Sequence, residues 1–249
     1  MFRYCNMSLQ TLSTDIITEI SKHLNVSDIS SLYYTSSSLH HTIGDNSHYI
    51  YSICKHIQPH GIVKTWHGIE NTGSIESEIS YIEGKKHGLH KNWYDNGQLL
   101  FHTIYLDNKS HGEHKHWYEN GQLSFHYFYS HDILNGTMRE WHENGQLAFQ
   151  GRYKNGKMVG VWKEWYANGQ LSFEGFYIDD KRNGEWREWY DNGILSFRCF
   201  YIDDRLDGYW KEWYYNGQIS FNCFYRDDKL QGGWKKWRSN GHISLQGIM

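Results

Sequence analysis

Apolar and polar positions alternate in short runs over most of the chain after residue 60. In one such run, Leu171, Phe173 and Tyr177 alternate with Ser172 and Glu174. Successive side chains of a β-strand point to opposite faces, so a period of two predicts a strand with its large apolar side chains on one face. The run therefore predicts a strand with a Leu, Phe and Tyr column.

Each run follows a tryptophan and an Asn-Gly pair, and this arrangement recurs every 24 residues. Seven tryptophans stand three residues before Asn-Gly: Trp93, Trp117, Trp141, Trp165, Trp189, Trp213 and Trp237. Asn-Gly between two strand-like runs is a strong hairpin signal, because both residues tolerate the positive φ of a tight turn. A fixed period of this length is typical of stacked repeats. We therefore predict an elongated, twisted antiparallel β-meander with one hairpin per repeat.

Two further columns follow the same period. A glycine stands five residues before each tryptophan, and a basic residue follows that glycine by three positions. The basic column is Lys91, Lys115, Arg139, Lys163, Arg187, Lys211 and Lys235. The same spacing occurs upstream at Gly61, Lys64 and Trp66. Residues 61–249 are therefore interpreted as one degenerate unit followed by seven regular repeats.

Residues 1–60 contain no tryptophan and no Asn-Gly, and their apolar positions recur at a helical period. Apolar side chains expected on the faces of the first two helices are Leu12, Ile16, Ile20, Leu24, Ile29 and Leu32. The pattern predicts a small helical domain over residues 1–60 before the repeat domain of residues 61–249. The predicted fold class is accordingly α+β.

Composition and charge restrict the class of partner and compartment. The 249 residues are 17% aromatic and carry a net charge of −3, which gives no general electrostatic case for binding nucleic acid. No signal-peptide core is evident near Met1, and no apolar run approaches the roughly 18 residues of a membrane span. We therefore expect a cytoplasmic protein that does not bind nucleic acid.

The sequence holds no recognisable catalytic or metal-binding constellation. Of 17 histidines, the dense cluster around His111, His114 and His116 lacks a cysteine or acidic partner at zinc spacing. Acidic pairs such as Asp179-Asp180 lack the interleaved oxygen ligands of a calcium loop and are interpreted as solvated turns. We therefore expect no enzyme activity, no metal and no cofactor.

Two of the four cysteines are expected to be buried free thiols. Cys199 and Cys223 occupy the column that Gly151, Gly175 and Gly247 fill in other repeats, which favours small buried side chains. Equivalent positions of successive hairpins are two strand spacings apart, about 9 to 10 Å, which is too far for a disulfide.

One strand face combines the basic column with tryptophans two residues further on. Because Trp and Arg are enriched in interface hot spots, this face is the candidate partner-binding surface. Its candidate residues are Lys163, Trp165, Arg187, Trp189, Lys211 and Trp213. The opposite face carries Trp162 and Glu164 with their equivalents in later repeats, and one of the two aromatic faces is expected to be the packing layer of the sheet.

Residues 160–171 and 208–219 read Gly-x-Trp-Lys-Glu-Trp-Tyr-x-Asn-Gly-Gln-Leu with small variations. This motif resembles the MORN-type repeat, in the variant that carries Trp-Tyr-x-Asn-Gly-Gln. The resemblance covers about residues 61 to 249 of the chain. It implies an antiparallel β-meander used for attachment to proteins or membranes, not a catalytic centre.

A second resemblance covers about residues 9 to 48, where the apolar spacing from Leu12 to Leu32 is similar to that of the F-box. It implies docking onto the adaptor subunit of a cullin-type ubiquitin ligase, with Leu12, Ile16, Ile20, Leu24, Ile29 and Leu32 as the contacts. The combination with MORN-type repeats resembles proteins of large DNA viruses that infect amoebae, which implies host cytoplasm. The alternative is that these residues form only a cap at the end of the sheet.

Three functions follow from these patterns. The leading hypothesis is a non-catalytic substrate receptor, in which residues 1–60 recruit the ligase adaptor and the repeats bind an unknown target protein. The second is a scaffold that associates with an anionic membrane surface. The third is a structural or inhibitory repeat module with a helical cap.

Overall fold

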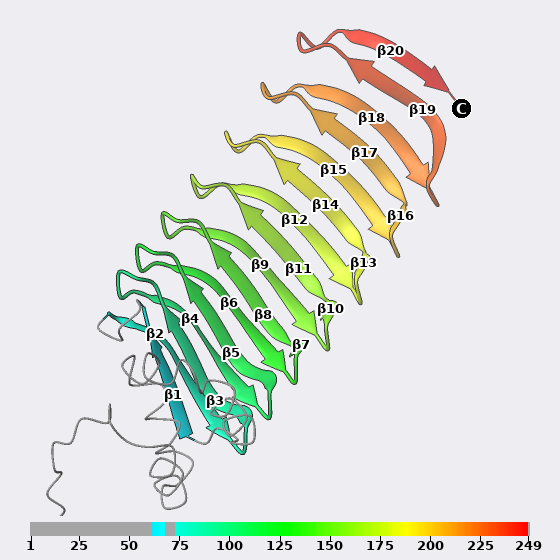
Figure 1. Cartoon of the computed structure of the whole chain (residues 1–249). Helices are drawn as coiled ribbons and strands as arrows, with labels where there is room; N and C mark the ends of the chain where they lie inside the picture. The colour runs from blue at the N-terminus through cyan, green and yellow to red at the C-terminus, as the bar shows by residue number, and fades with distance from the viewer. Residues whose placement is uncertain (1–60, 68–72, 249) are drawn as a thin grey trace, which may run out of the picture. The chain divides into compact units, whose positions relative to one another are not determined.

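A computed structural model of the chain describes residues 61–67 and 73–248. These residues form twenty β-strands and no helix, and every strand pairing is antiparallel (Figure 1). The predicted α+β class is therefore wrong, because the described residues are all-β. The predicted helical domain of residues 1–60 lies outside them. No helix that could cross a membrane is found in the part of the chain that the structure describes.

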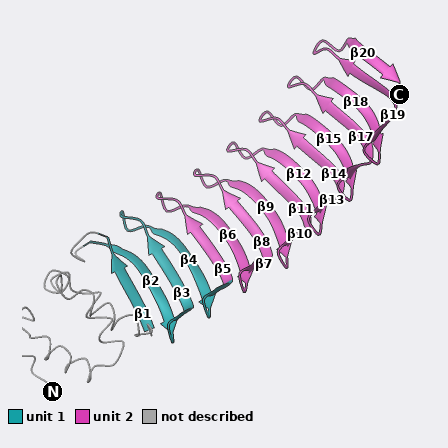
Figure 2. Ribbon diagram, turned by 45° about the vertical axis from the view of Figure 1, so that its right-hand side comes forward, with its two compact units in different colours: residues 1–111 teal, residues 112–249 magenta. Residues whose placement is uncertain are grey.

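The chain divides into two compact units, residues 1–111 and residues 112–249 (Figure 2). The described strands of the first unit are β1 (Gly61–Trp66), β2 (Ile75–Ile82), β3 (Lys85–Trp93) and β4 (Leu99–Leu106). Strand β5 (Lys109–Trp117) begins just before the boundary. The second unit continues with β6 (Leu123–Ser130), β7 (Ile133–Leu134), β8 (Gly136–Trp141), β9 (Leu147–Lys154), β10 (Lys157–Met158), β11 (Gly160–Trp165), β12 (Leu171–Ile178), β13 (Lys181–Arg182), β14 (Gly184–Trp189), β15 (Leu195–Ile202), β16 (Arg205–Leu206), β17 (Gly208–Trp213), β18 (Ile219–Arg226), β19 (Lys229–Trp237) and β20 (Ile243–Ile248).

Each repeat contains one long hairpin, as the periodicity predicts, and the hairpins share one register. In β11 and β12, Trp162 pairs with Gly175 and Glu164 pairs with Phe173. The register then shifts by one residue before Trp165. The first hairpin, β1 with β2, has the same shift at Trp66. Directly paired residues share a face, so this register fixes the two faces of the sheet over residues 136–226.

We call these the tryptophan face and the lysine face. The tryptophan face of the hairpin β11–β12 carries Trp162, Glu164, Phe173, Gly175 and Tyr177. The lysine face carries Val161, Lys163, Glu174 and Phe176. Equivalent positions of the other hairpins follow the same assignment.

The predicted hairpin turn at Asn-Gly is a three-residue loop. Tyr166 N donates to Gln170 O at 2.8 Å, and Gly169 N donates to Tyr166 O at 2.8 Å. Gly169 takes a positive φ of 84°, whereas Asn168 does not. This arrangement is a type I turn followed by a left-handed glycine. The expectation that both residues adopt positive φ is therefore wrong for the asparagine.

Asn168 instead uses its side chain to join neighbouring repeats. Its Oδ1 accepts a hydrogen bond from Gln170 N at 3.0 Å, and its Nδ2 donates to Asp191 O in the next turn at 2.8 Å. The tyrosine that begins the turn does the same, because Tyr166 OH donates to Trp189 O at 2.7 Å. The Trp-Tyr-x-Asn-Gly motif therefore supplies both the turn and a bond to the following turn.

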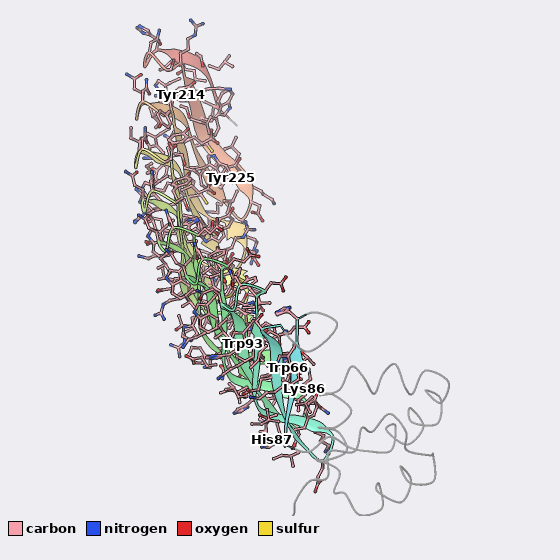
Figure 3. The ribbon with its side chains drawn as sticks, turned by 60° about the vertical axis from the view of Figure 1, so that its left-hand side comes forward. Trp66, Lys86, His87, Trp93, Tyr214 and Tyr225 are labelled. Carbon is pink, nitrogen blue, oxygen red and sulfur yellow. The ribbon has the colours of Figure 1, made fainter. Side chains whose placement is uncertain are left out.

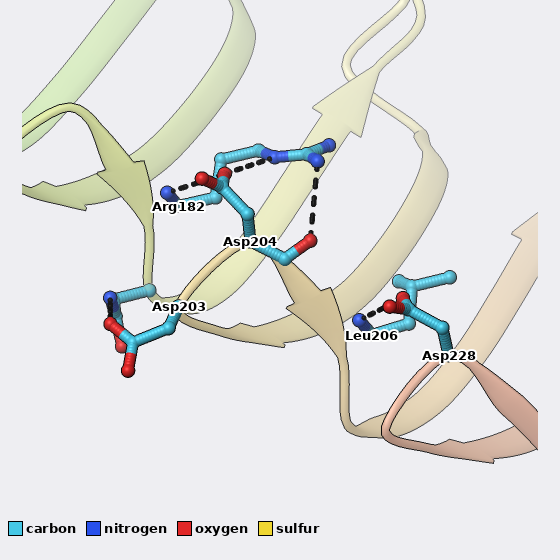
Figure 4. A network of polar contacts seen from close by, with 6 residues as sticks. Arg182, Asp203, Asp204, Leu206 and Asp228 are labelled. Atoms are coloured by element: carbon cyan, nitrogen blue, oxygen red, sulfur yellow. Dashed lines mark hydrogen bonds and ion pairs between the residues drawn. The ribbon is translucent and has the colours of Figure 1, made fainter.

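The two-residue turns lie at the acidic pairs, at the opposite end of the strands. Asp203 and Asp204 have φ of 49° and 69°, which the two-residue turn of a twisted hairpin requires. Asp204 Oδ1 accepts from Arg182 N at 2.9 Å, and Asp228 Oδ1 accepts from Leu206 N at 2.8 Å (Figure 4). The acidic pairs are therefore turns, as expected, and they also bond each turn to the preceding one.

Most of the buried side chains lie on the tryptophan face. Trp162 is 4% exposed, and its ring centroid lies 5.2 Å from that of Phe149 and 5.1 Å from that of Tyr153, both edge to face. The ring covers Gly151, where an added Cβ would lie 2.6 Å from the indole. The tryptophan face is therefore the packing layer of this single-layer sheet.

Candidate functional site: the two faces of the repeat sheet

The lysine face brings the predicted basic column together with acidic partners. Lys163 Nζ lies 3.0 Å from Glu174 Oε2, and Arg187 forms an ion pair with Glu185. Lys211 Nζ lies 5.2 Å from the ring centroid of Tyr209, a cation–π contact. Lys163 is therefore compensated by a carboxylate on its own face, whereas Arg187 shares Glu185 with Arg198.

Large apolar side chains are exposed on the same face. Val161 is 48% exposed, Phe176 38%, Phe200 41% and Tyr209 60%. Val161 pairs directly with Phe176, and Tyr209 pairs directly with Phe224. Sequence reasoning missed these residues, although a phenylalanine recurs every 24 residues at positions 176, 200 and 224. We call Val161, Phe176, Phe200 and Tyr209 the apolar patch.

The predicted tryptophans Trp165, Trp189 and Trp213 lie beyond the register shift and are not joined to the basic column. Trp165 pairs with Leu171, and its carbonyl oxygen lies 2.7 Å from His142 Nε2. The carbonyl of Trp189 accepts from Tyr166, and that of Trp213 from Tyr190 at 2.8 Å. In the described residues, no cation–π contact joins Lys163, Arg187 or Lys211 to these indoles.

A row of alternating phenylalanines and glutamates crosses the tryptophan face. On β11, Glu164 pairs with Phe149 on one side and with Phe173 on the other, and Phe173 pairs in turn with Glu188. We call the whole series the Phe–Glu row: Phe125, Glu140, Phe149, Glu164, Phe173, Glu188, Phe197, Glu212 and Phe221. Figure 3 shows side chains that project from both faces of the ribbon. Tyr225, which is labelled there, lies on strand β18.

Two glutamates of the row have a raised pKa. Partial loss of hydration beside the neighbouring rings raises the pKa of Glu140 and that of Glu188, and the negative charge of Glu164 is the second cause. Trp210 Nε1 donates to Glu212 Oε1 at 2.9 Å, whereas the buried Nε1 atoms of Trp162 and Trp186 have no hydrogen-bond partner in the described structure. The row is therefore an uncompensated acidic line beside buried indole donors.

On strand β5, histidines of the cluster take the place of the tryptophan and the glutamate of this face. His114 occupies the tryptophan column and His116 the glutamate column, with their Nε2 atoms 2.9 Å apart. The pKa of His116 is lowered by burial. No group of three or more His, Cys, Asp or Glu that could hold a metal ion occurs within residues 61–67 and 73–248.

The two cysteines of the repeats are buried free thiols, as the glycine column suggested. Cys199 and Cys223 are each 1% exposed, and they pair across the hairpin with Trp186 and Trp210. Burial raises the pKa of Cys199 to about 12 and that of Cys223 to about 11. The thiols therefore stay protonated at neutral pH and are unsuited to nucleophilic chemistry.

The adaptor contacts predicted from the F-box resemblance lie outside the described residues. They are Leu12, Ile16, Ile20, Leu24, Ile29 and Leu32.

The comparison with protein families supports the repeat assignment alone. The model of the MORN repeat variant matches residues 86–107, 110–131, 134–155, 158–179, 182–203 and 206–227, together more than half of the chain. It supports neither the F-box resemblance nor the viral one. The search of curated proteins found no match. The six matched segments coincide with successive hairpins that share one register, and the chain belongs to the MORN repeat variant family.

Proposed function

We propose that this protein is a non-catalytic repeat scaffold that binds a partner protein through its lysine face. MORN repeats are consistent with attachment to either proteins or membranes. The observation that carries the choice of a protein partner is the apolar patch. Its phenylalanines and tyrosine are of the kind that anchors protein interfaces, and they lie beside charged side chains that can form a polar rim.

Carboxylates offset part of the basic charge of the lysine face, and this partial compensation supports a protein rather than a membrane as the partner. Peripheral binding to anionic lipid depends on uncompensated basic residues, each worth about 1 kcal/mol near the surface. On this face Lys163 is paired with Glu174 and Arg187 with Glu185. The compensated pairs instead provide hydrogen-bonding groups around the apolar patch.

The test removes the apolar patch from the full-length protein and compares its crosslinked partners by quantitative mass spectrometry. In the double variant Phe176→Ser/Phe200→Ser, partners that depend on the patch should be lost. The control is Leu245→Ser, which removes a side chain that is 60% exposed and belongs to the tryptophan face. Partners that survive Leu245→Ser and disappear from the double variant support the proposal. An identical set of partners in both variants contradicts it.

A vesicle sedimentation assay separates the membrane alternative. The wild-type protein is mixed with vesicles that contain phosphatidylserine, at low and at moderate salt. We expect no binding under either condition. Salt-sensitive sedimentation that is retained by Phe176→Ser/Phe200→Ser would instead favour the membrane scaffold.

We further propose that the protein recruits a ubiquitin ligase. This role rests on the sequence of residues 12–32 and its resemblance to the F-box. In this role the repeats hold a target in the cytoplasm while the adaptor brings the ligase. The test is a pull-down of purified adaptor by the full-length chain, with and without Leu12→Asp. Binding that Leu12→Asp abolishes supports the role. Absence of binding in the wild type leaves a scaffold with no ligase partner.

A further inference from the structure

The two faces of the second unit differ in how their charges are balanced. On the lysine face, Glu174 lies between the two strands that carry Lys163 and Arg187, and it pairs with Lys163. On the tryptophan face, no ion pair with a basic residue is formed by Glu140, Glu164, Glu188 or Glu212 among the described residues. The acidic charge of the Phe–Glu row is thus uncompensated.

The negative potential extends to the aromatic residues beside the row. The pKa of Tyr153 is raised by burial and then by the charges of Asp180 and Glu140. The pKa of Tyr225 is raised by burial, with Glu212 among the lesser causes. A cation placed over these rings is attracted both by the carboxylates and by the π faces of the rings.

A contact within the chain shows that the tryptophan face accepts an arginine side chain. The guanidinium carbon of Arg182 lies 4.1 Å from the ring centroid of Tyr201 and 5.6 Å from that of Trp186. Its Nε lies 3.0 Å from Asp204 Oδ1, as Figure 4 shows. Arg182 thus combines an aromatic ring with a carboxylate at the margin of the tryptophan face.

The middle of the tryptophan face also combines aromatic rings with carboxylates, but without a cation. Glu164 and Glu188 are exposed, and each is flanked by two phenylalanines of neighbouring strands. Trp162 is 4% exposed, and its buried Nε1 has no partner in the described part of the chain. In the equivalent pair of a later repeat, Trp210 Nε1 donates to Glu212 Oε1.

The distance between successive glutamates of the Phe–Glu row determines how far apart the basic residues of a ligand must be. Glutamates stand on every second strand of the sheet, so they are about 9 to 10 Å apart. A polyproline-type chain has three residues per turn and advances about 3.1 Å per residue, so three residues span that distance and every third side chain points to the same side. A basic residue at every third position would therefore meet one glutamate each.

We propose that the Phe–Glu row binds a polyproline-type segment of a partner protein that carries arginine or lysine at every third residue and crosses the strands of the sheet. The carboxylates of Glu164 and Glu188 accept hydrogen bonds from the basic groups, and the flanking phenylalanine rings receive their alkyl stems. This surface is separate from the apolar patch and goes beyond the function proposed above.

The test measures binding of two fluorescent peptides to the full-length chain by anisotropy. One peptide repeats Arg-Pro-Pro five times, so that it adopts the polyproline conformation, and the other has the same composition with its arginines in one block. The variant is Glu164→Gln/Glu188→Gln, and the matched control is Glu174→Gln/Glu185→Gln, which removes the same charge from the lysine face. We expect the spaced peptide to bind more tightly than the block, and its affinity to fall about fivefold to tenfold in the variant alone.

Two results would overturn the proposal. One is an equal loss of affinity in the variant and the control, which indicates binding to net charge. The other is equal affinity of the wild type for the spaced and the blocked peptide. The wild type also gives a readout independent of any substitution, because the indole N–H signals of Trp162 and Trp186 should shift in NMR spectra when the spaced peptide is added. Phe176→Ser/Phe200→Ser should bind this peptide normally, which separates this site from the apolar patch.

Discussion

At the scale of single residues, the small-residue column decides how the tryptophans pack. Trp186 pairs with Cys199, and Gly175 lies beside the same indole, where an added Cβ would approach Trp186 to 2.8 Å. The sequence predicted a small buried column at these positions. It did not predict which tryptophan covers which glycine, because that contact joins strands of different repeats.

Gly151→Ala is expected to lower the free energy of unfolding by about 1 to 3 kcal/mol, because the added Cβ would lie 2.6 Å from the Trp162 ring. The measurement is urea unfolding followed by tryptophan fluorescence. The control is Gly233→Ala, where the nearest atom to the added Cβ is Gly247 O at 3.6 Å. A loss in the control as large as that in Gly151→Ala would contradict this explanation.

The buried thiols predict a pH dependence of stability. Burial raises the pKa of Cys199 to about 12, whereas an unfolded cysteine has a pKa of about 8.5. A folded-state pKa above the unfolded value means that the contribution to stability is complete below about pH 8.5 and is lost as the pH rises toward 12.

The measurement compares urea unfolding between pH 8 and pH 10 in the wild type and in Cys199→Ala/Cys223→Ala. We expect the free energy of unfolding to fall more steeply with pH in the wild type. Parallel pH profiles of the two proteins would show that these thiols do not titrate on unfolding as described.

At the scale of the hairpin, side chains in each turn form hydrogen bonds with a neighbouring turn. The sequence predicted a turn at Asn-Gly, and it predicted polar turns at the acidic pairs. It assigned the asparagine a backbone role, whereas Asn168 acts through its amide on Asp191 O. The loop type depends on the twist of the two flanking strands as well as on the residues of the turn, so the dipeptide alone does not fix it.

Tyr166→Phe is expected to lower the free energy of unfolding by about 1 kcal/mol, because it removes the hydrogen bond to Trp189 O at 2.7 Å. Urea unfolding measures the change. Tyr209→Phe is the matched control, since this tyrosine is 60% exposed and its ring is retained. The explanation fails if both substitutions have the same effect.

At the scale of the molecule, the second unit is built from repeats that contact their neighbours in sequence. Strand β12 pairs with β11, β13 and β14, and β15 pairs with β14, β16 and β17. Stability in such an arrangement is close to a sum of repeat and interface terms.

Deletion of residues 160–183, one full period of 24 residues, is therefore expected to give a folded β-protein with a smaller urea m-value and lower stability. Circular dichroism and urea unfolding measure both. The control deletion of residues 160–171 removes half a period. It takes away one strand of a hairpin, so the remaining strand stands where the next repeat requires the other one. We expect that protein to lose cooperative unfolding. Equal behaviour of the two deletions would contradict a repeat-by-repeat fold.

The sequence by itself determined the hairpin repeat, its period and the assignment of Trp162 and Glu164 to the face opposite Lys163. These properties follow from backbone geometry, because side chains of a strand alternate with a period of two. The α+β class was wrong for the described residues, which are all-β, because its helical part was assigned to residues 1–60, outside them.

Only the tertiary structure decided which side chains of different repeats lie side by side. Phe173 lies between Glu164 and Glu188, and the apolar patch is exposed beside compensated charges, because neighbouring hairpins pair in one register. That register comes from hydrogen bonds and ring packing between residues up to 24 positions apart. A period in the sequence specifies how often such contacts recur, whereas packing between strands selects the partners.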